Sequence, residues 1–420
     1  MTAPPKPLTL PQLGAVVAGN ALEFYDFLTF SFFAVQIGAV FFPGHDATGR
    51  LLLTLATFGV GFLTRPLGGA VIGPLGDRLG RKPAMLFSFG LMGLSIVGLA
   101  LTPSYARIGW YAPLLAVLFR LLQGFALGGE VGPTTAFLME SAPRHRRGLY
   151  VSLQNATQYF STLCAGLVGL ALANWLSPQD LTAWGWRVAF LLGAAVVPFA
   201  LIMRKNLPET LPETVHAETQ RQRLSRPQLW LGLLGLCMLA SLTIATYTMN
   251  YMGTFGMHSL GIPASKAFGA TVAVGVCATA GALLGGFLSD RLGRKPVMIG
   301  GTLLLLLLGL PCFAVMSQLK SVFALLAGSG LMALATGLYA PAILAGLSES
   351  LPTSLRAGSL GIIYALAISC FGGSAQFVVT WLIDVTGSPL APAWYMSGAL
   401  LLGLAGMIGM RETAPVKLGY

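Results

Sequence analysis

The chain has 420 residues, of which 55% are hydrophobic and 9% are charged, whereas ordinary globular proteins carry about 25% charged residues. So few charges argue against a soluble enzyme, a nucleic-acid-binding protein and a secreted disulfide scaffold, even though the formal net charge is +11. A membrane-spanning helix takes roughly 20 to 25 residues, so this length suits about twelve spans joined by short loops.

Twelve apolar runs, separated by proline, glycine or charged clusters, predict twelve membrane helices. The runs lie at about residues 13–41, 51–75, 84–102, 111–139, 149–175, 187–203, 228–256, 267–288, 297–316, 321–347, 358–383 and 393–410. The predicted fold class is therefore an all-α integral membrane protein.

Basic residues are distributed unevenly among the predicted loops. If the N-terminus lies inside the cell, most Lys and Arg residues fall in cytoplasmic loops and tails. Five fall outside: Arg50, Arg107, Arg187, Lys266 and Lys320. Cytoplasmic loops accumulate Lys and Arg, so this bias and the even number of spans predict two cytoplasmic termini.

The longest polar stretch, residues 204–227, contains prolines and alternating charges and has no apolar face. This composition is typical of a linker. It predicts a cytoplasmic connection between an N-terminal six-helix bundle at 1–203 and a C-terminal six-helix bundle at 228–420.

The two halves repeat each other. GDRLGRKP at 76–83 returns as SDRLGRKP at 289–296, and ESAPRHRRG at 140–148 returns as ESLPTSLRAG at 349–358. Internal repeats of this kind are a mark of secondary transporters.

The repeated charges predict ionic latches at the cytoplasmic ends of the two halves, formed in one state and broken in the other. The alternative is a set of positive-inside loops with helix-ending turns, and the duplication favours the latches. The gating candidates are Asp77, Arg78, Arg81, Lys82, Glu140 and Arg147 in the first half, and Asp290, Arg291, Arg294, Glu349 and Arg356 in the second.

The motif G-x-x-G-D-R-x-G-R-K after the second span, with its echo after the eighth, resembles the signature of the major facilitator superfamily. Four segments are similar to its metabolite:proton symporter family: GNALEFYDF at 19–27, FLTRPLGGAVIGPLGDRLGRK at 62–82, RLLQGFALGGEVG at 120–132 and WGWRVAFLLG at 184–193. That family includes bacterial carriers of citrate, other di- and tricarboxylates, 2-oxoglutarate, shikimate, and betaine or proline.

Among family members, the sequence GWRVAFLLGAAVVPFALIMRKNLPET and the FFP after the first span look most like the citrate and tricarboxylate carriers. The resemblance implies a major facilitator fold in the bacterial inner membrane. One departure is Pro74, which stands where the family often has a histidine just before the Gly-Asp pair. A coupling or gating role of that histidine would be absent or moved in this chain.

Five ionisable residues lie inside predicted spans: Glu23, Asp26, Arg65, Arg120 and Glu130. Burying a charge in a membrane helix costs at least ~2.5 kcal/mol, so such residues usually face a cavity and function there. Arginine binds carboxylates through a planar fork, which makes Arg65 and Arg120 candidate ligands for an anionic substrate. The carboxyl groups of Glu23, Asp26 and Glu130 are candidate proton carriers.

Each of these charges has a structural alternative. Arg65 or Arg120 can belong to an ion pair within the first half, and Glu23 can neutralise such an arginine. The RLLQG setting of Arg120 resembles the fourth-helix motif of the superfamily, in which the arginine is tied to proton coupling.

Uncharged polar residues in the spans are further candidates for a substrate site. The alternative for each of them is an interhelical hydrogen bond or an interfacial aromatic position. They are Asn20 and Gln123 in the first half, and Tyr247, Asn250, Tyr251, Tyr339, Tyr364 and Gln376 in the second.

The sequence contains no enzyme motif, no pair of histidines with metal-ligand spacing and no P-loop, so neither a metal nor another cofactor is expected. It predicts a secondary transporter that imports a small organic anion, a di- or tricarboxylate such as citrate, with protons or with sodium in their place. The two bundles would rock about a midplane site, and a monomer suffices. A carrier of a zwitterion such as betaine or proline, a drug/proton antiporter and a receptor remain as alternatives.

Overall fold

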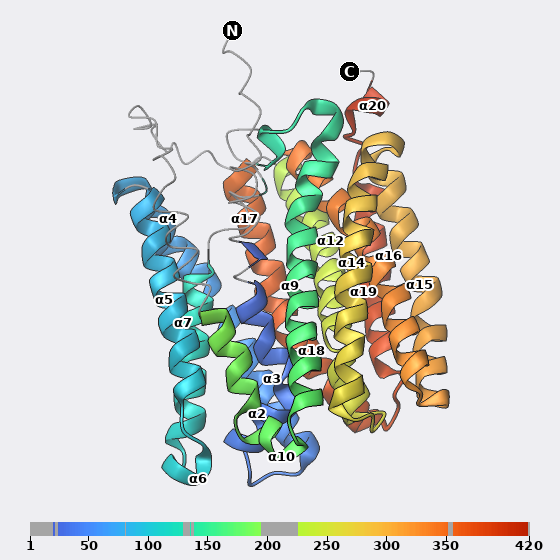
Figure 1. Cartoon of the computed structure of the whole chain (residues 1–420). Helices are drawn as coiled ribbons and strands as arrows, with labels where there is room; N and C mark the ends of the chain where they lie inside the picture. Colours follow the sequence, from blue (N-terminus) through green and yellow to red (C-terminus); the bar gives the residue numbers. More distant parts are fainter. Residues whose placement is uncertain are drawn as a thin grey trace.

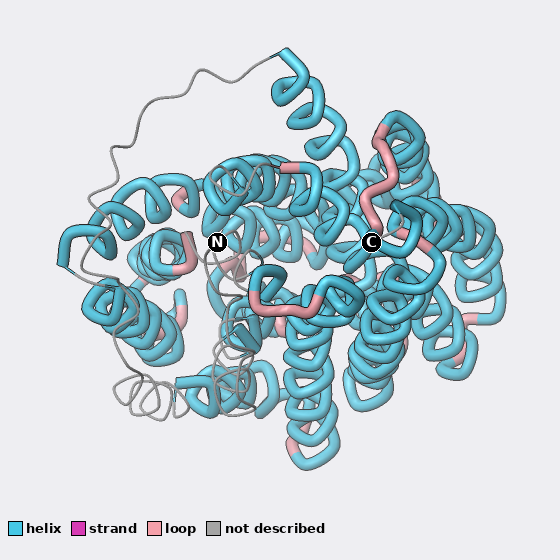
Figure 2. The backbone as a smooth tube through the Cα atoms, turned by 90° about the horizontal axis from the view of Figure 1, so that it is seen from above, coloured by secondary structure: helices cyan, strands magenta, loops and turns pink. Residues whose placement is uncertain are grey.

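The computed structural model describes residues 20–21, 24–79, 81–128, 135, 138–194, 226–351 and 356–418, without the side chains at 73–86, 227, 356–358 and 418. Glu23 and Glu130, two of the predicted proton carriers, lie outside the described residues. Regular structure in the described part is helical throughout, which confirms the predicted all-α class (Figure 1, Figure 2).

The helices follow one another through short connections. Those of the first half are Phe24–Phe32, α2 (Ala34–Phe41), α3 (Ala47–Leu63), α4 (Arg65–Leu79), α5 (Arg81–Leu101), α6 (Tyr105–Ile108), α7 (Tyr111–Ala126), η1 (Arg144–Arg146), α9 (Arg147–Trp175), α10 (Pro178–Asp180), η2 (Leu181–Gly185) and residues 186–194. Those of the second half are α12 (Arg226–Asn250), α13 (Met252–His258), α14 (Ala264–Leu292), α15 (Arg294–Leu319), α16 (Val322–Ser350), α17 (Arg356–Ala367), η3 (Ile368–Gly372), α18 (Gly373–Thr386), α19 (Ala391–Gly409) and α20 (Pro415–Leu418).

Each of the twelve predicted runs contains a helix. Within the described residues, eight helices are long and apolar enough to cross a membrane, and the pair Phe24–Phe32 and Ala34–Phe41, bent by 67°, makes a ninth. The shorter apolar helices Phe87–Leu101 and Tyr111–Ala126 and the helical residues 186–194 occupy the third, fourth and sixth runs.

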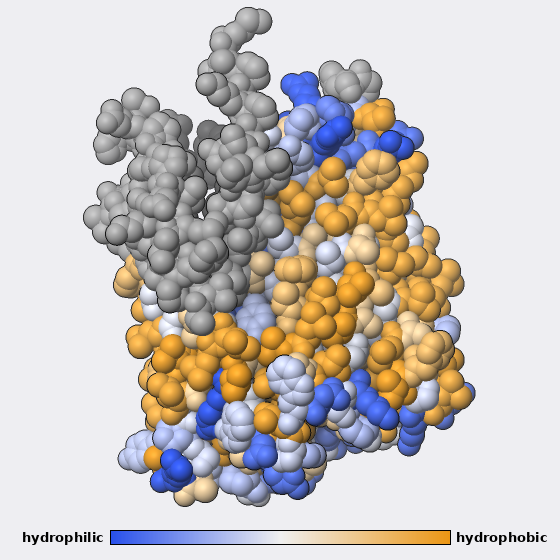
Figure 3. Space-filling model, viewed as in Figure 1, coloured by the Kyte–Doolittle hydropathy of each residue, from blue (hydrophilic) through white to orange (hydrophobic). Residues whose placement is uncertain are grey.

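The outward faces of these helices are apolar. Large side chains such as Leu63, Leu307 and Phe323 are exposed, and hydrophobic residues cover the middle of the described surface in Figure 3, with hydrophilic residues at its two ends. In a bilayer, a helix satisfies all of its backbone hydrogen bonds within one segment. The apolar runs therefore form long helices whose side chains face lipid.

The two halves meet along the antiparallel helices α9 and α14, which lie side by side in Figure 1. A Cβ atom added to Gly275 of α14 would lie 2.4 Å from the backbone nitrogen of Leu163, and one added to Gly166 of α9 would lie 2.9 Å from that of Val272. Glycine allows this close approach of two helix backbones. A second contact joins α3 to α18, where a Cβ on Gly59 would lie 2.5 Å from the carbonyl oxygen of Gly373.

Two hydrophobic clusters form the core. One is built mainly from first-half residues, including the eight buried phenylalanines from Phe24 to Phe62, and the other is built mainly from second-half residues. The linker at 204–227 lies almost entirely outside the described residues, so the domain boundaries stay a prediction. We call the end of the bundle at which α20 lies the inner end (top of Figure 1) and the opposite end the outer end.

Candidate functional site

A pocket lies between α9 of the first half and helices of the second half. Polar lining groups come from both sides, and the described lining contains carboxamides and hydroxyls but no Asp, Glu, Lys or Arg. The lining residues are Asn155 and Gln158 of α9, Leu239, Leu242, Thr243, Thr246 and Tyr247 of α12, Leu344 of α16, Tyr364 of α17 and Ile368 of η3.

The pocket is narrow in this conformation. Its cavity volume of about 20 Å³ is enough for about one water molecule. An organic solute can therefore enter only when α9 and α12 move apart. Because these helices belong to different halves, the size of the site depends on the arrangement of the halves.

The amides of α9 and its neighbours divide into two groups. Asn20 donates its side-chain N–H to the backbone oxygen of Gln154 at 3.1 Å and to Oγ1 of Thr157 at 2.8 Å, and Gln154 accepts a hydrogen bond from Thr135. These groups join helices. Asn155, in contrast, is 6% exposed at the pocket, and its Oδ1 atom has no hydrogen-bond partner among the described residues.

Arg120 lies deep in the first half, in a cage of phenylalanine rings. Its guanidinium carbon is 4.3 Å from the ring centroid of Phe27, 4.8 Å from that of Phe30 and 4.9 Å from that of Phe58. The guanidinium donates to Oε1 of Gln123 at 2.5 Å and to the backbone oxygen of Phe58 at 3.3 Å. Cation–π contacts away from water are worth about 2 kcal/mol. Both Arg120 and Gln123 thus have partners within the protein.

Arg65 lies closer to the pocket. Its guanidinium carbon is 4.3 Å from the ring centroid of Phe27 and 4.5 Å from that of Phe62, so the Phe27 ring contacts both arginines. The Phe62 ring in turn contacts the ring of Tyr247, which lines the pocket, with centroids 5.5 Å apart. The arginine is therefore at the margin of the pocket, next to the boundary between the halves.

Asp26 packs against the sixth predicted span. Its side chain is 1% exposed, and a Cβ added to Gly193 would lie 1.7 Å from its Oδ1 atom. The carboxyl group therefore lies directly against the backbone of helix 186–194, the sixth predicted span. Oδ1 has no hydrogen-bond partner in the part of the chain that the structure describes. Its shared cavity with Glu23 stays a prediction, because Glu23 lies outside that part.

The second-half candidates occupy different surroundings. Tyr251 accepts a hydrogen bond from Thr380 at 3.0 Å, and Gln376 accepts one from Ser31 of the first half at 2.7 Å. Both make interhelical contacts, as the structural alternative expects. Tyr247 lines the pocket.

Several buried polar groups of the second half have no hydrogen-bond partner among the described residues. Among the predicted site residues, these groups are the hydroxyls of Tyr247 and Tyr339 and both side-chain polar atoms of Asn250. Of these residues, Tyr247 is the one that lines the pocket. The substrate roles of Asn250 and Tyr339 stay predictions.

Four polar lining residues were missed by the sequence analysis: Asn155, Gln158, Thr243 and Thr246. The signal was present in both helices. The run QNATQ interrupts an apolar span and places Asn155 and Gln158 three residues apart, and Thr243, Thr246 and Tyr247 follow the same spacing in α12. Residues three and four apart share a helix face.

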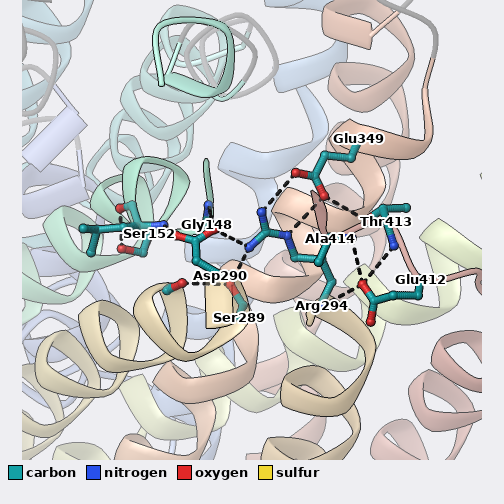
Figure 4. Close-up of polar contacts among 11 residues, drawn as sticks. Gly148, Ser152, Ser289, Asp290, Arg294, Glu349, Glu412, Thr413 and Ala414 are labelled. Carbon is teal, nitrogen blue, oxygen red and sulfur yellow. Dashed lines mark hydrogen bonds and ion pairs between the residues drawn. The ribbon is translucent and has the colours of Figure 1, made fainter. Parts of the chain in front are cut away.

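At the inner end, the predicted charges of the second half form a cluster (Figure 4). Arg294, fully buried, pairs with Asp290 at 2.8 Å and with Glu349 at 3.0 Å. Asp290 also accepts hydrogen bonds from the backbone N–H groups of Gly148 at 2.8 Å and Leu149 at 2.9 Å. It therefore caps the first turn of α9, in the other half, where a carboxylate is stabilised by the helix dipole.

The C-terminal segment completes this cluster, which the sequence analysis did not foresee. Glu412 accepts hydrogen bonds from the backbone N–H groups of Arg294 at 2.9 Å and Lys295 at 3.0 Å, and Thr413 donates to Glu349 at 2.8 Å. Burial raises the pKa of the Glu412 carboxyl, but the backbone N–H donors outweigh it and hold that pKa below its usual value. The signal in the sequence is the polar RET directly after the last span.

The remaining gating candidates are less defined. The Arg291 guanidinium lies 4.3 Å from the ring centroid of Phe287 on its own helix. Glu140 is exposed, and Arg147 is the first residue of α9. The side chains of Asp77, Arg78, Arg81, Lys82 and Arg356 lie outside the described residues, so the matching cluster in the first half stays a prediction.

The halves also touch at the outer end. Oγ1 of Thr48, in α3, lies 3.4 Å from Nε2 of His258, at the end of α13. Asn174 of α9 donates to the backbone oxygen of Ser265 in α14 at 3.3 Å. The structure therefore has contacts between the halves at both ends, which agrees with the narrow pocket between them.

Both halves of the chain match the sequence models of known transporter families. Residues 26–284 match the sequence model of the Major Facilitator Superfamily, and residues 240–412 match that of the Sugar (and other) transporter family. The Citrate-proton symporter of Klebsiella pneumoniae is 36% identical over 97% of this chain and 94% of that protein. The Ectoine/proline transporter ProP of Corynebacterium glutamicum is 30% identical over 99% of this chain and 86% of that protein.

A solved structure with the same fold is the proton:xylose symporter XylE of the major facilitator superfamily, bound to 6-bromo-6-deoxy-D-glucose. It superimposes with a TM-score of 0.77 over 96% of each chain, at 19% sequence identity. These similar proteins are transporters. Among the described residues, no group of three or more His, Cys, Asp or Glu side chains could hold a metal ion.

Proposed function

Because this chain belongs to the major facilitator superfamily, we propose that it imports a small organic anion, a di- or tricarboxylate of the citrate type, together with protons. The proposal agrees with the name of the 36% identical relative, a citrate-proton symporter. The transporter needs no bound cofactor, since the proton gradient supplies the energy.

The position of Arg65 carries the proposal that the substrate is an anion. The described pocket lining is uncharged, and Arg65 lies at its margin, over the Phe62 ring that contacts the ring of Tyr247. The rings of Phe27 and Phe62 hold its guanidinium in place. A guanidinium binds a carboxylate through two parallel hydrogen bonds. Arg120 lies behind the same Phe27 ring and adds positive potential to the site.

Asp26 supports the proton part of the proposal. Burying a charge without a partner is costly, and ionisable groups at such positions in membrane proteins commonly form proton pathways. Glu23 and Glu130 are the other proposed carriers. We propose that a proton taken up by one of these groups accompanies the substrate and that both leave on the cytoplasmic side.

The placement of the pocket supports the proposal of alternating access. Its walls come from α9 on one side and α12, α16 and α17 on the other, so rocking of one half against the other opens it to one side at a time. Opening of the inner end would break the contact of Asp290 with the first turn of α9. We propose that Asp290, Arg294 and Glu349 act as the inner latch of the second half.

We further propose a bacterial inner-membrane location with both termini in the cytoplasm, on the basis of the basic cytoplasmic loops. The lipid bilayer is the surrounding partner, and one chain suffices for transport because the pocket lies within it. Sodium in place of protons is tested by the same measurement as the substrate.

A second candidate is a proton-coupled carrier of a zwitterion such as betaine or proline. The 30% identical ectoine/proline transporter favours it. The uncharged pocket lining would also suit a solute without net charge. A drug/proton antiporter is less well supported, because it has no use for an arginine at the pocket margin.

Uptake by proteoliposomes tests these proposals. We expect an inward proton gradient, but not an inward sodium gradient, to stimulate the uptake of labelled citrate or a related di- or tricarboxylate. Glycine betaine and proline should not compete. If no di- or tricarboxylate is taken up under a proton gradient, the anion proposal is wrong, and proton-driven betaine uptake would establish the second candidate.

A further inference from the structure

We propose that Asn155 recognises a hydrogen-bond donor on the substrate, so that hydroxylated di- and tricarboxylates bind more tightly than the same acids without the hydroxyl. This inference rests on the proposed transport of organic anions and names the feature of the anion that the pocket selects. Asn155 is thereby a specificity-determining residue.

The first observation is that a hydrogen-bond acceptor of Asn155 has no donor among the described residues. Oδ1 of Asn155 is buried at the pocket and has no hydrogen-bond partner among the described residues. Buried polar groups in proteins are almost always hydrogen-bonded, and leaving one unpaired is costly. An ionised carboxylate has no proton to donate, so it cannot satisfy this atom. A hydroxyl can.

The second observation concerns the hydrogen bonds of the polar groups near Asn155. The nearby amides Asn20 and Gln154 already bind other helices, which leaves Asn155 and Gln158 as the amides that line the pocket. The Tyr247 hydroxyl on the opposite wall also has no partner in the described part of the molecule. A substrate hydroxyl both donates and accepts, so it can bind an amide and a phenol together.

The third observation indicates that the carboxylates and the hydroxyl of the substrate bind at different parts of the pocket. Arg65 lies at one margin of the pocket, over the Phe62 ring, and that ring contacts the Tyr247 ring with centroids 5.5 Å apart. The described lining on the α9 side has amides and no positive charge. Carboxylates therefore belong at the Arg65 margin, and the uncharged polar group of the substrate belongs at Asn155.

This division has a consequence for competing solutes. A quaternary ammonium such as glycine betaine carries no N–H or O–H group, so it leaves Asn155 unsatisfied. Succinate and propane-1,2,3-tricarboxylate also have no hydroxyl, yet they match malate and citrate in their carboxylates. These acids form two matched pairs that differ by one hydroxyl.

The test measures dissociation constants of the four acids for the purified full-length protein at a pH at which the acids are ionised. We expect malate and citrate to bind roughly 10-fold more tightly than their hydroxyl-free partners, as the loss of one buried hydrogen bond predicts. In Asn155→Ala, this ratio should fall to about one, mainly because the hydroxylated acids bind less tightly. Retained binding of the hydroxyl-free acids shows that the variant is folded.

Asn174→Ala is the matched control, because Asn174 is on the same helix but at its exposed outer end. It should keep the wild-type ratio. Equal binding of both members of each pair by the wild type, or an unchanged ratio in Asn155→Ala, would overturn this inference and leave anion transport standing. If none of the four acids binds, the proposed function itself is wrong, and this inference falls with it.

Discussion

The ring of Phe27 contacts the guanidinium groups of both Arg65 and Arg120, and each guanidinium carbon lies 4.3 Å from the ring centroid. Positive charges that share a ring would repel each other in the absence of compensation. Backbone oxygens and Gln123 bind the Arg120 guanidinium within the first half, whereas the Arg65 guanidinium lies over the Phe62 ring, which contacts the pocket residue Tyr247. We therefore expect Arg65, rather than Arg120, to bind a substrate carboxylate.

Replacement of Arg65 by glutamine tests this assignment. A hydrogen bond to a charged group contributes about 1.5–3 kcal/mol, so kcat/KM for uptake of the anion should fall roughly 10- to 100-fold. Arg107→Gln, at an exposed arginine of α6, should keep wild-type uptake. The assignment is contradicted if Arg65→Gln transports the anion normally in proteoliposomes.

Asp26 provides a second test at the level of a single residue. In Asp26→Asn, the side chain keeps its shape but cannot release a proton. We expect a proton gradient to stop driving uptake, while exchange of labelled for unlabelled substrate continues. Asp180→Asn, at an exposed position of the outer end, should preserve both activities. Proton-driven uptake that persists in Asp26→Asn would assign coupling to another group.

Among the elements, the first turn of α9 depends on a residue from the other half. Asp290 of α14 accepts its N–H groups and also pairs with Arg294, which in turn binds Glu349 of α16. Glu412 of the C-terminal segment caps the first turn of α15 in the same cluster. Three helix ends are thus tied together by carboxylates at the inner end.

Asp290→Asn should weaken the contact between Asp290 and the first turn of α9. A side chain that caps a helix N-terminus contributes about 0.5–2 kcal/mol, so the inner end should open more often. Ser152 of α9 is fully buried against α14. A cysteine introduced there, in a variant without the five native cysteines, should react roughly 2- to 30-fold faster with a maleimide.

Asp180→Asn is the control for this measurement, because it removes an exposed carboxylate at the outer end that takes no part in the cap. Its labelling rate should equal that of the protein with Asp290 intact. Unchanged labelling in Asp290→Asn would mean that the cap does not hold the inner end closed.

At the scale of the whole molecule, the protonation of His258 at the outer end should influence the equilibrium between open and closed states. Burial lowers the pKa of His258 below its ordinary value, although the carboxylates of Asp384 and Asp46 act in the opposite direction. A histidine with a lowered pKa in the closed state favours that state above its ordinary pKa of about 6.5. This contribution is lost as the pH falls through the lowered pKa.

Mild acid should therefore open the outer end. Spin labels on Arg50→Cys and Lys266→Cys, in a variant without the native cysteines, report the distance between the halves. We expect it to increase as the pH falls below about 6.5, and His258→Gln to remove this dependence. His45→Gln, at an exposed histidine of the same end, should retain it. A pH response that survives in His258→Gln would contradict the assignment.

Much of the fold follows from local properties of the sequence. Hydropathy and length predict helices because a bilayer leaves an apolar segment no other way to satisfy its backbone. The repeated SDRLGRKP and ESLPTSLRAG segments marked Asp290, Arg294 and Glu349, and the structure brings all three together. Charges in apolar spans marked Arg65 and Asp26, because so few charged residues occur there.

The sequence by itself determined the membrane helices, the repeat and the short set of buried charges. Only the tertiary structure decided which polar groups face the pocket. Gln154 and Asn155 are neighbours of the same kind in one helix, yet Gln154 accepts a hydrogen bond from Thr135 and Asn155 lines the pocket. The difference arises because the helices around α9 come from distant parts of the chain, and their packing selects the partner of each side chain.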